Sequence, residues 1–362
     1  MKRIGLVVLF SLLLVAAGIV QAADLTIDPS YPFATVGPQG EQAATHDQIE
    51  LSPSDKEAVR AGKFKAAICL HQTTVWTKAV TNGIRDTFND LGIEIVAITD
   101  AEMDSQKQTT DIETVLALRP NIIITLPIDP VSAASALRPA IEQGVKIVLL
   151  SNLPTGFVHG KDYAAIVTDD LFQMGKSVAE MIGDALGGKG RVALLYHDAN
   201  YYVTNQRDLA VKAVLQRDYP GIEIVAERGI ADPNDGNVVA SALLTQYPNL
   251  DAIYAPWDTI AEGVVAAARS VSSKVQIFTI DLGNTSAMDM ARGGNMKGIV
   301  ADLPYVLGQK LAEVGALSVL GRETPPFVTV PAVKIDRGNL AEMWPEVMNE
   351  PLPQDIANVL SR

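Results

Sequence analysis

Apolar residues recur at two different spacings along most of this chain. From Phe64 onward, short runs rich in β-branched residues alternate with stretches of helical apolar spacing, a pattern typical of parallel α/β sheets. The predicted strands are Lys65–Leu70, Glu94–Thr99, Asn121–Leu126, Lys146–Leu150, Ala164–Val167, Arg191–Tyr196, Glu223–Ala226, Ala252–Ala255, Val275–Ile280 and Gly298–Val300. The predicted helices between them are Val75–Leu91, Gln106–Leu118, Pro130–Gln143, Leu171–Leu186, Val203–Arg217, Gly236–Gln246 and Thr259–Arg269.

A repeated hexapeptide relates the two halves of the chain. Gly-Ile-Glu-Ile-Val-Ala occurs at Gly92–Ala97 and again at Gly221–Ala226, and a similar tetrapeptide follows each copy, at Pro127–Pro130 and Pro256–Thr259. The offset of 129 residues (221 − 92) is far longer than a solenoid repeat, which runs about 20–50 residues. It has the length of a domain. The chain is therefore predicted to fold as two similar lobes with a cleft between them.

Two later segments and one early segment do not repeat. A helix is predicted at Tyr305–Leu320 and a strand at Val328–Ile335, and we expect these to complete the opposite lobe, with several crossings between lobes. Residues 23–63 are rich in Pro, Gly, Gln and acids, with one short helix-like stretch at Asp55–Ala61. This segment is expected to form an extended N-terminal arm.

The N-terminus has the pattern of a secretory signal. Lys2 and Arg3 precede the apolar run Gly5–Val20, and small residues lead to a cleavage site near Ala22/Ala23. A membrane anchor is the alternative, but the run is shorter than the roughly 20 residues that a span needs. We expect the mature protein to be exported to the periplasm.

Charge and cysteine content narrow the class of partner. The formal net charge is −13, and removing the two cations of the signal gives −15 (−13 − 2). Such acidity argues against nucleic acid and anionic membranes as partners. Cys69 is the single cysteine, so the chain has no internal disulfide, and its apolar neighbours predict a core position.

The candidate functional residues follow the predicted strands, because open parallel sheets bind ligands beyond the carboxyl ends of their strands. The first half contributes His71-Gln72-Thr73-Thr74 with Trp76, Ile128-Asp129 and Ser151-Asn152. The second half contributes His197 to Tyr202 with Asn205 and Arg207, then Trp257-Asp258, Asp281 and Asp302. This set is rich in aromatic, carboxylate and amide side chains.

Several of these residues also fit purely structural roles. Asp129 and Asp258 open helices, where a capping carboxylate is common. His71 fits a hydrogen-bonded side chain at a strand end, and Arg207 fits an ion pair with a neighbouring carboxylate. Trp76 and Trp257 are harder to explain as core residues, because both follow a strand end.

Templates for catalysis and metal binding find no match. Gly187-Gly188-Lys189-Gly190 precedes a strand rather than opening a helix, unlike a phosphate-binding loop. The chain has no G-x-S-x-G motif, and its four histidines lack the helical spacing of a zinc site. We therefore expect no enzyme activity, no cofactor and no metal.

At these residues the chain resembles periplasmic solute-binding proteins of the ribose/galactose type, the sugar-binding partners of ABC importers. The resemblance runs from Phe64 to about Ile335. It rests on strand order and on three segments: Asp251–Asp258 at the family's second-lobe strand and ligand loop, Ile280–Gly283 at its F-D-G run, and Val300–Pro304 at its hinge.

The resemblance implies the periplasmic binding protein-like I fold, an α/β fold with two doubly wound parallel-sheet lobes. A three-segment hinge joins them near Thr168–Asp169, Asp302–Leu303 and Val328–Pro331. The expected organisation is a signal peptide at 1–22, an N-terminal extension at 23–63, lobe 1 at 64–168 plus 303–327, lobe 2 at 169–302 plus 328–345, and a C-terminal tail at 346–362.

This chain departs from the family at the expected site. The family commonly carries Asp-Arg where Ser151-Asn152 stands, an arginine where Asn205 stands, and amides where Trp257 and Asp302 stand. The site therefore loses positive charge and gains an acid and an aromatic face. Of the adjacent tyrosines, only one is expected to face the cleft. The predicted ligand-binding residues are Trp76, His71, Asn152, Tyr202, Asn205, Trp257, Asp281 and Asp302.

The resemblance implies the substrate-binding component of an ABC importer, a monomer that captures a sugar or sugar alcohol by hinge closure and docks on a membrane permease. A cationic amine-type solute is the alternative, because an acidic, aromatic cleft suits cation–π contact. Two further classes stay open: a binding protein that signals to a chemoreceptor or sensor kinase, and an exported enzyme on the same scaffold.

Overall fold

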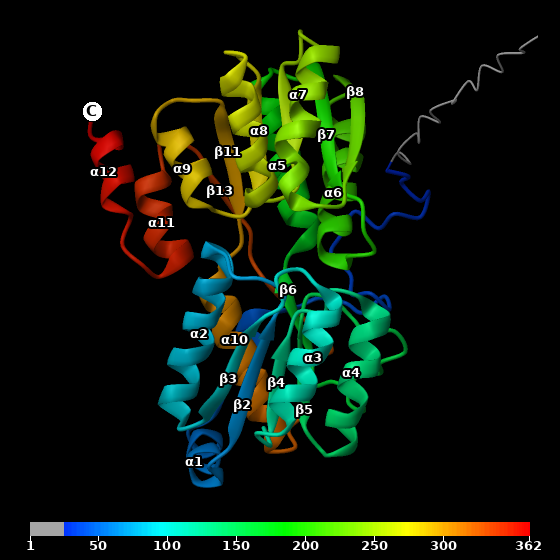
Figure 1. The fold of residues 1–362 in the computed structure, drawn as a ribbon, viewed down its shortest axis with the longest axis vertical. Coiled ribbons are helices and arrows are strands. Elements are labelled where there is room, and N and C mark those ends of the chain that lie inside the picture. The colour runs from blue at the N-terminus through cyan, green and yellow to red at the C-terminus, as the bar shows by residue number, and fades with distance from the viewer. Residues whose placement is uncertain (1–24) are drawn as a thin grey trace, which may run out of the picture.

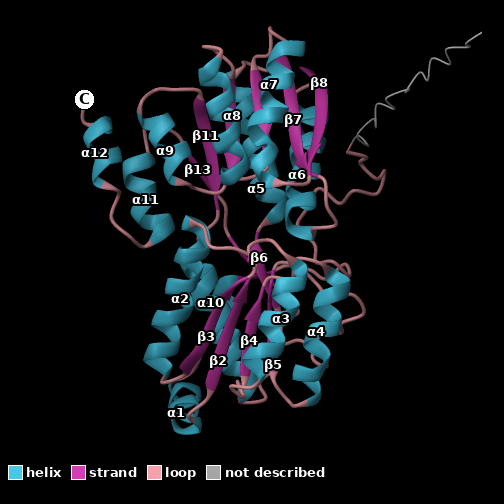
Figure 2. Ribbon diagram, viewed as in Figure 1, coloured by secondary structure: helices cyan, strands magenta, loops and turns pink. Residues whose placement is uncertain are grey.

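The computed structural model describes residues 25–362, so the predicted signal peptide lies outside the described residues. The described chain forms two lobes, one above the other in Figure 1, and helices flank the strands of each lobe in Figure 2. Each lobe is built around its own sheet. The predicted α/β fold with two parallel-sheet lobes is confirmed.

The first lobe includes two elements of the N-terminal arm, β1 and α1, together with elements that follow it. Its helices are α1 (Pro53–Gly62), α2 (Val75–Leu91), α3 (Ser105–Leu116), α4 (Pro130–Glu142) and α10 (Pro304–Val319). Its strands are β1 (Ala44–Thr45), β2 (Lys65–Leu70), β3 (Glu94–Asp100), β4 (Ile122–Thr125), β5 (Lys146–Leu150), β6 (Ile166–Asp169) and β12 (Phe327–Val330).

The second lobe takes the middle of the chain and its C-terminal end. Its helices are α5 (Leu171–Ala185), α6 (Tyr202–Asp218), α7 (Gly236–Gln246), α8 (Asp258–Ser270), α9 (Asn284–Ala291), α11 (Leu340–Met348) and α12 (Gln354–Leu360). Its strands are β7 (Lys189–His197), β8 (Gly221–Ile230), β9 (Ala252–Ala255), β10 (Gln276–Ile280), β11 (Met296–Ala301) and β13 (Val333–Ile335).

The two sheets share one strand order. Across residues 25–362, the first sheet has the order β1-β12-β6-β5-β4-β2-β3 and the second has the order β13-β11-β10-β9-β7-β8. All pairings are parallel except that of β13 with β11. The strand sets β5-β4-β2-β3 and β10-β9-β7-β8 therefore match position by position, as the sequence repeat predicts.

The repeated hexapeptide forms the edge strand in each lobe, and the two copies share a backbone irregularity. In β3 the register against β2 skips Val96, because Ile95 pairs with Ala66 and Ala97 with Ala67. In β8 the register against β7 skips Val225 in the same way. Val96 and Val225 lie 129 residues apart (225 − 96). A β-bulge bends a strand and increases its local twist, so both copies bend their edge at one equivalent residue.

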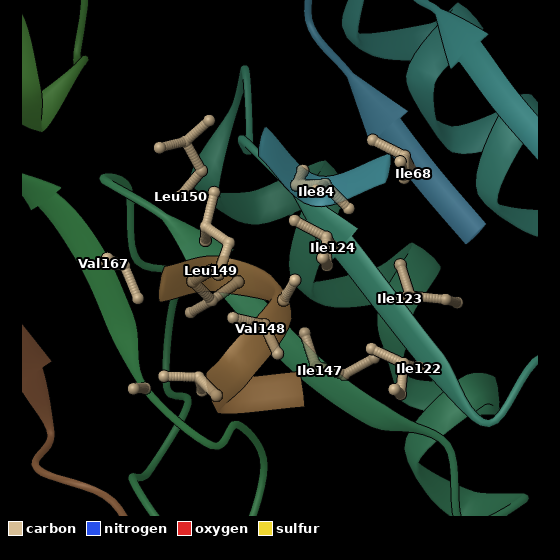
Figure 3. Close-up of a cluster of buried hydrophobic side chains, with 14 of the residues drawn as sticks. Ile68, Ile84, Ile122, Ile123, Ile124, Ile147, Val148, Leu149, Leu150 and Val167 are labelled. Carbon is tan, nitrogen blue, oxygen red and sulfur yellow. The ribbon is translucent and has the colours of Figure 1, made fainter. Parts of the chain in front are cut away.

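Both faces of the first sheet are covered, which explains its continuous apolar strands. All four residues of β4 are buried, and so are the last four of β5. Figure 3 shows these side chains packed with those of β2, β6 and α2. The labelled residues are Ile68, Ile84, Ile122, Ile123, Ile124, Ile147, Val148, Leu149, Leu150 and Val167.

The helices α2 and α10 approach each other closely through two glycines. A Cβ atom on Gly308 would lie 2.0 Å from the carbonyl oxygen of Val80, and one on Gly83 would lie 2.0 Å from the carbonyl oxygen of Tyr305. Any larger side chain would push the helices apart. Because α10 follows the second-lobe strands in sequence, this packing anchors the returning chain to the first lobe (Figure 1).

After the N-terminal arm, the described chain passes between the lobes at three places: β6 to α5, β11 to α10 and β12 to β13. The predicted single strand Val328–Ile335 is corrected here to two strands in different sheets. Pro331, which lacks an amide hydrogen for a ladder, separates them. The first sheet consequently extends through Val330, beyond the expected lobe boundary at residue 327.

Three helices escape the sequence prediction, namely α9, α11 and α12. Each has fewer than ten residues, too few turns for a clear apolar period. Trp344 and Ile356 are buried in the second-lobe core, so the predicted C-terminal tail packs on that lobe. Within residues 25–362, every helix falls short of the length and apolar character that a membrane span requires.

The N-terminal arm contacts both lobes. The amide of Leu25 donates to the carboxylate of Glu227 in the second lobe (3.0 Å). Ile49 and Leu51 are buried in the first-lobe core, and β1 adds a strand to the first sheet beside β12. Between these anchors, the backbone carbonyl of Val36 accepts a hydrogen bond from the Tyr202 hydroxyl at the start of α6 (2.7 Å). The arm is therefore an ordered strap across the hinge.

Candidate functional site

A small cavity lies between the lobes, at the carboxyl ends of strands from both sheets. The first lobe lines it with His71, Gln72, Thr74, Trp76, Met103, Leu126 and Ser151. The second lobe lines it with His197, Tyr201, Val203, Thr204, Arg207, Trp257, Asp258 and Asp281. The predicted cleft site is thus built from both copies of the repeat.

The cavity volume is about 50 Å³. One water position needs roughly 10–15 Å³ by this kind of measure, so the space holds only a few waters. The lobes also touch each other around it: Tyr201 and Val203 pack into the first-lobe core, and Ala79 packs into the second-lobe core. A solute the size of a sugar ring enters only if the lobes separate or side chains move.

Arg207 of α6 is the buried cation of this site. Its Nε donates to Oδ2 of Asp169 at 2.7 Å, and its guanidinium lies 3.4 Å from Oδ2 of Asp281. Asp169 ends β6 in the first sheet, and its other oxygen accepts a hydrogen bond from Thr168 (3.0 Å). This ion pair crosses the hinge, because α6 belongs to the second lobe. Burial opposes the charge of Arg207, but the neighbouring carboxylates raise its pKa above the ordinary value.

Asp281 follows β10 directly and has an unusual backbone. Its φ is +66°, a left-handed conformation that non-glycine residues seldom adopt. Ser151, which follows β5 at the equivalent place in the first lobe, has a φ of +61°. Within the described chain, Oδ1 of Asp281 is buried without a hydrogen-bond partner. Burial raises the pKa of Asp281 to about 6, although Arg207 acts in the opposite direction.

Asp302 lies on the crossing between the lobes that joins β11 to α10, and its carboxylate binds the indole of Trp76. Trp76 Nε1 donates to Oδ1 of Asp302 at 2.8 Å, and both side chains are buried. Burial, together with Asp169 and Asp281, raises the pKa of Asp302 well above its usual range. Asp302 itself lies outside the cavity lining, so its visible role is to position the indole.

An aromatic group from the second lobe forms much of the cavity wall. The His197 ring lies 4.9 Å from that of Trp257 and 5.1 Å from that of Tyr201, measured between centroids. His197 Nδ1 is 2.8 Å from the Thr204 hydroxyl. Burial lowers the pKa of His197 to about 4, and it lowers that of His71 to about 4 as well. Both imidazoles are therefore neutral at pH 7.

The duplicated aspartates have different surroundings. Asp129 is the N-cap of α4, and its carboxylate accepts hydrogen bonds from the amides of Val131 (3.1 Å) and Ser132 (2.7 Å). Asp258 is instead the first residue of α8 and lines the cavity. Its carboxylate accepts from the amide of Thr259 at 2.8 Å. Burial raises the pKa of Asp258 to about 7, and Asp281 contributes in the same direction.

Besides Asp302, three expected ligand residues lie outside the cavity lining, namely Tyr202, Asn205 and Asn152. Tyr202 turns toward the N-terminal arm, and Tyr201 faces the cavity instead, which reverses the expected choice. Tyr201 is the N-cap of α6 with an extended backbone and Tyr202 is the first helical residue, so their side chains leave the chain in different directions. The Asn205 side chain accepts a hydrogen bond from the amide of Tyr201 (3.0 Å) and donates one to the carbonyl of His197 (3.1 Å). These two bonds close the loop between β7 and α6.

Asn152 connects the lobes. Its Nδ2 donates to the carbonyl of Pro127 at 2.9 Å, and its Oδ1 accepts from the amide of Val203 at 3.1 Å. Pro127 belongs to the first lobe and Val203 to the second. Both polar ends of the amide are thus occupied in this closed arrangement.

Sequence reasoning did not select Met103, Leu126, Val203 or Thr204 as lining residues. Met103 follows β3, so the strand-end rule applied to that strand would have found it. Leu126 follows β4 and is apolar, and Val203 and Thr204 lie in the first turn of α6; none of these three has a signal in the sequence. Among residues 25–362, no group of three or more His, Cys, Asp or Glu side chains is arranged to hold a metal ion.

Known proteins share both the sequence pattern and the fold. The family described as periplasmic binding protein domain matches residues 66–323. The ribose import binding protein of Bacillus subtilis is 25% identical over 255 residues, 70% of this chain and 80% of that protein. The D-allose-binding periplasmic protein of Escherichia coli is 27% identical over 262 residues, 69% and 82% of the two chains.

Solved structures show the same architecture. A solute-binding protein of an ABC transporter from Agrobacterium vitis, with bound α-D-tagatopyranose, superposes with a TM-score of 0.73 at 17% identity, covering 81% of this chain and 100% of that one. The match to the family extends over most of the chain, from β2 to the residues after α10. The chain therefore belongs to the family of periplasmic binding protein domains.

Proposed function

We propose that this protein is the periplasmic solute-binding component of an ABC importer and that it captures a small sugar or sugar alcohol. The observation that supports this most is the set of buried polar atoms at the interlobe cavity that lack partners in the described chain: His71 Nδ1, Trp257 Nε1 and Asp281 Oδ1. An unsatisfied buried polar group costs about 1–3 kcal/mol. Hydroxyl groups donate and accept at once, so a polyol satisfies such a mixed set. Two of the relatives are named for ribose and for allose.

Hinge closure is the proposed mode of capture. The cavity of about 50 Å³ admits a ring only after the lobes open, and the chain segments at the three crossings are the places where they can rotate. A solute that contacts Trp76 in one lobe and Trp257 and Asp281 in the other stabilises the closed form by its higher affinity for that form. The closed pair of lobes then docks on the membrane permease.

A thermal-shift screen of neutral pentoses, hexoses and cyclic polyols tests solute capture. A ligand is expected to raise the melting temperature of the wild-type protein and of Asp129→Ala, whose carboxylate caps α4 outside the cavity. The Asp281→Ala variant should lose the shift. If every compound leaves the wild-type melting temperature unchanged, or if both variants respond alike, the proposed site is wrong.

Three further expectations belong to the same proposal. The protein is a monomer without catalytic activity on its solute, and its mature chain begins near Ala23. Intact-mass measurement on protein recovered from the periplasm checks the cleavage site, and light scattering checks the oligomeric state. Incubation with the bound sugar followed by mass spectrometry should return the sugar unchanged.

A further inference from the structure

The interlobe site holds more buried negative charge than positive charge. Arg207 lies in the electrostatic field of Asp169, Asp281 and Asp302, and all four side chains are buried. Asp258, which lines the cavity, interacts with Asp281 as well. Among the described residues that line the cavity, Arg207 is the only one with a permanent positive charge. The site thus holds four buried carboxyl groups and one guanidinium.

Arg207 cannot neutralise this group by itself. Its two directed contacts go to Oδ2 of Asp169 and Oδ2 of Asp281, at 2.7 and 3.4 Å. Asp302 has the indole of Trp76, a neutral donor, as its hydrogen-bond partner. Removing a charge from water without a counter-charge is costly, so such a site either takes up protons or receives a cation.

The acceptor atom that remains available to a ligand is Oδ1 of Asp281. It is the buried carboxylate oxygen of the cavity lining that has no hydrogen-bond partner in the described chain, and the residue as a whole is 9% exposed. Asp258 is less suited, because its Oδ1 already accepts from the amide and hydroxyl of Thr259. A ligand atom that donates to Asp281 would complete the coordination of this carboxylate.

We propose that the captured solute carries a positively charged nitrogen beside its hydroxyl groups, as in an amino sugar or an amino polyol, and that this nitrogen binds Asp281. The inference rests on the proposed function, since it specifies the class of solute for the same site. The aromatic wall supports it: Trp76, Trp257 and Tyr201 offer π faces that attract a cation, and both histidines are neutral.

The test compares matched ligands on the full mature protein by isothermal titration calorimetry. D-Glucosamine is set against D-glucose and N-acetyl-D-glucosamine, and an aminodeoxy-inositol against myo-inositol. At least one amine should bind ten times more tightly than both its hydroxyl and its acetylated counterpart. Added salt should reduce that preference, because screening weakens charge–charge attraction. If the neutral member of each pair binds as tightly as the amine, the inference fails and the proposed function stands.

Other outcomes separate the two proposals. Binding of tetramethylammonium alone, without any sugar or polyol, would retain the charge preference and overturn the capture of a polyhydroxylated solute. Absence of binding by every compound, amine or neutral, would count against both. The wild-type comparison depends on ligands alone, so it stays decisive even if a variant does not fold.

A pair of variants tests whether Asp281 is the residue that binds the charged nitrogen of the ligand. Asp281→Asn keeps the shape of the side chain and should reduce the preference for the amine at least tenfold, with little effect on a neutral ligand. Asp129→Asn removes the same charge from the N-cap of α4 in the first lobe, outside the cavity, and should leave the preference intact. An unchanged preference in Asp281→Asn would overturn the assignment of Asp281.

The pH dependence supplies a second readout. The titratable or charged groups around Asp281 are Asp169, Arg207, Asp258, Asp302, Tyr201, Tyr254, His71 and His197. Because burial raises the pKa of Asp281 to about 6 and that of Asp258 to about 7, protons compete with a cation below these values. Amine affinity should therefore rise from pH 5 to pH 7, a range in which the amino sugar keeps its ammonium proton. A flat or falling profile for the amine contradicts the proposal.

Discussion

Removal of the Arg207 charge is the most direct test of how the hinge is stabilised. In Arg207→Met the side chain keeps much of its apolar length and loses the guanidinium. Asp169, fully buried at the end of β6, then loses a contact of 2.7 Å, and Asp281 loses one of 3.4 Å. Both carboxylates stay in place with no other cation lining the described cavity.

The magnitude follows from burial. Loss of one partner from a buried ion pair costs about 3–5 kcal/mol, because the remaining charge is left without compensation. The Arg207 side chain is 4% exposed and that of Asp169 is 1% exposed, so this figure applies. Arg60 and Asp90 form a matched control on the surface, at 47% and 63% exposure. Exposed pairs contribute about 0–1 kcal/mol, so Arg60→Met should change the free energy of unfolding by less than 1 kcal/mol.

The loss should depend on pH. The folded-state pKa of Asp281 is already above its unfolded value, and loss of the guanidinium raises it further. A carboxyl group with a raised folded-state pKa destabilises the protein as pH rises from the unfolded value through the folded one. Urea unfolding of Arg207→Met should therefore show its largest deficit at pH 8 and a smaller deficit at pH 5.

Two results would refute this reasoning. A cost below 1 kcal/mol at pH 8, equal to that of Arg60→Met, would mean that Arg207 does not hold charged carboxylates at the hinge. A deficit that stays constant or grows toward pH 5 would mean that it does not arise from carboxylates left without a counter-charge. Either result would also weaken the charge argument for an amine ligand.

Three further variants and one chemical probe test other parts of the structure. Asp258→Asn should raise the free energy of unfolding at pH 8 by up to about 4 kcal/mol, since a pKa shift of about three units corresponds to that energy, and the gain should vanish near pH 4 in urea titrations. Tyr202→Phe should lower the unfolding free energy by about 1 kcal/mol through loss of the bond to Val36, and leave solute affinity unchanged in calorimetry. Gly308→Ala should lower the free energy of unfolding by at least about 1–3 kcal/mol in urea titrations, because the new methyl group would overlap the Val80 carbonyl oxygen. Cys69, fully buried with its pKa raised to about 12 by burial, should react with a thiol reagent only as the protein unfolds, as followed by absorbance.

Much of the fold could be predicted from the sequence, because the signals are local. The helix α2 begins after Thr74, which caps it, and ends at Gly92 with a left-handed φ, so its expected bounds Val75–Leu91 match the structure. The strands β2, β5 and β9 also match residue by residue. The misjudged segment was Val328–Ile335, where one apolar run serves two sheets and the direction after Pro331 depends on the packing of both lobes.

The strand-end rule located the cleft but not the contacts within it. It brought His71, Trp76, Trp257 and Asp281 to one place, because the carboxyl ends of parallel strands share an edge. It did not show that Tyr201 rather than Tyr202 faces the cavity, since that depends on the residue at which α6 begins. It also did not show that both ends of the Asn152 amide join the lobes.

The sequence by itself determined the two lobes and the strand ends at which a ligand meets them, since periodicity and caps are properties of neighbouring residues and the repeat is visible along the chain. Only the tertiary structure decided which polar atoms stay open. Arg207 contacts Asp281, which lies 74 positions away in the sequence, and Trp76 binds Asp302, which lies 226 positions away. Such contacts depend on how the lobes meet, and no local pattern encodes them. They leave one oxygen of Asp281 free, and the proposed ligand chemistry rests on that oxygen.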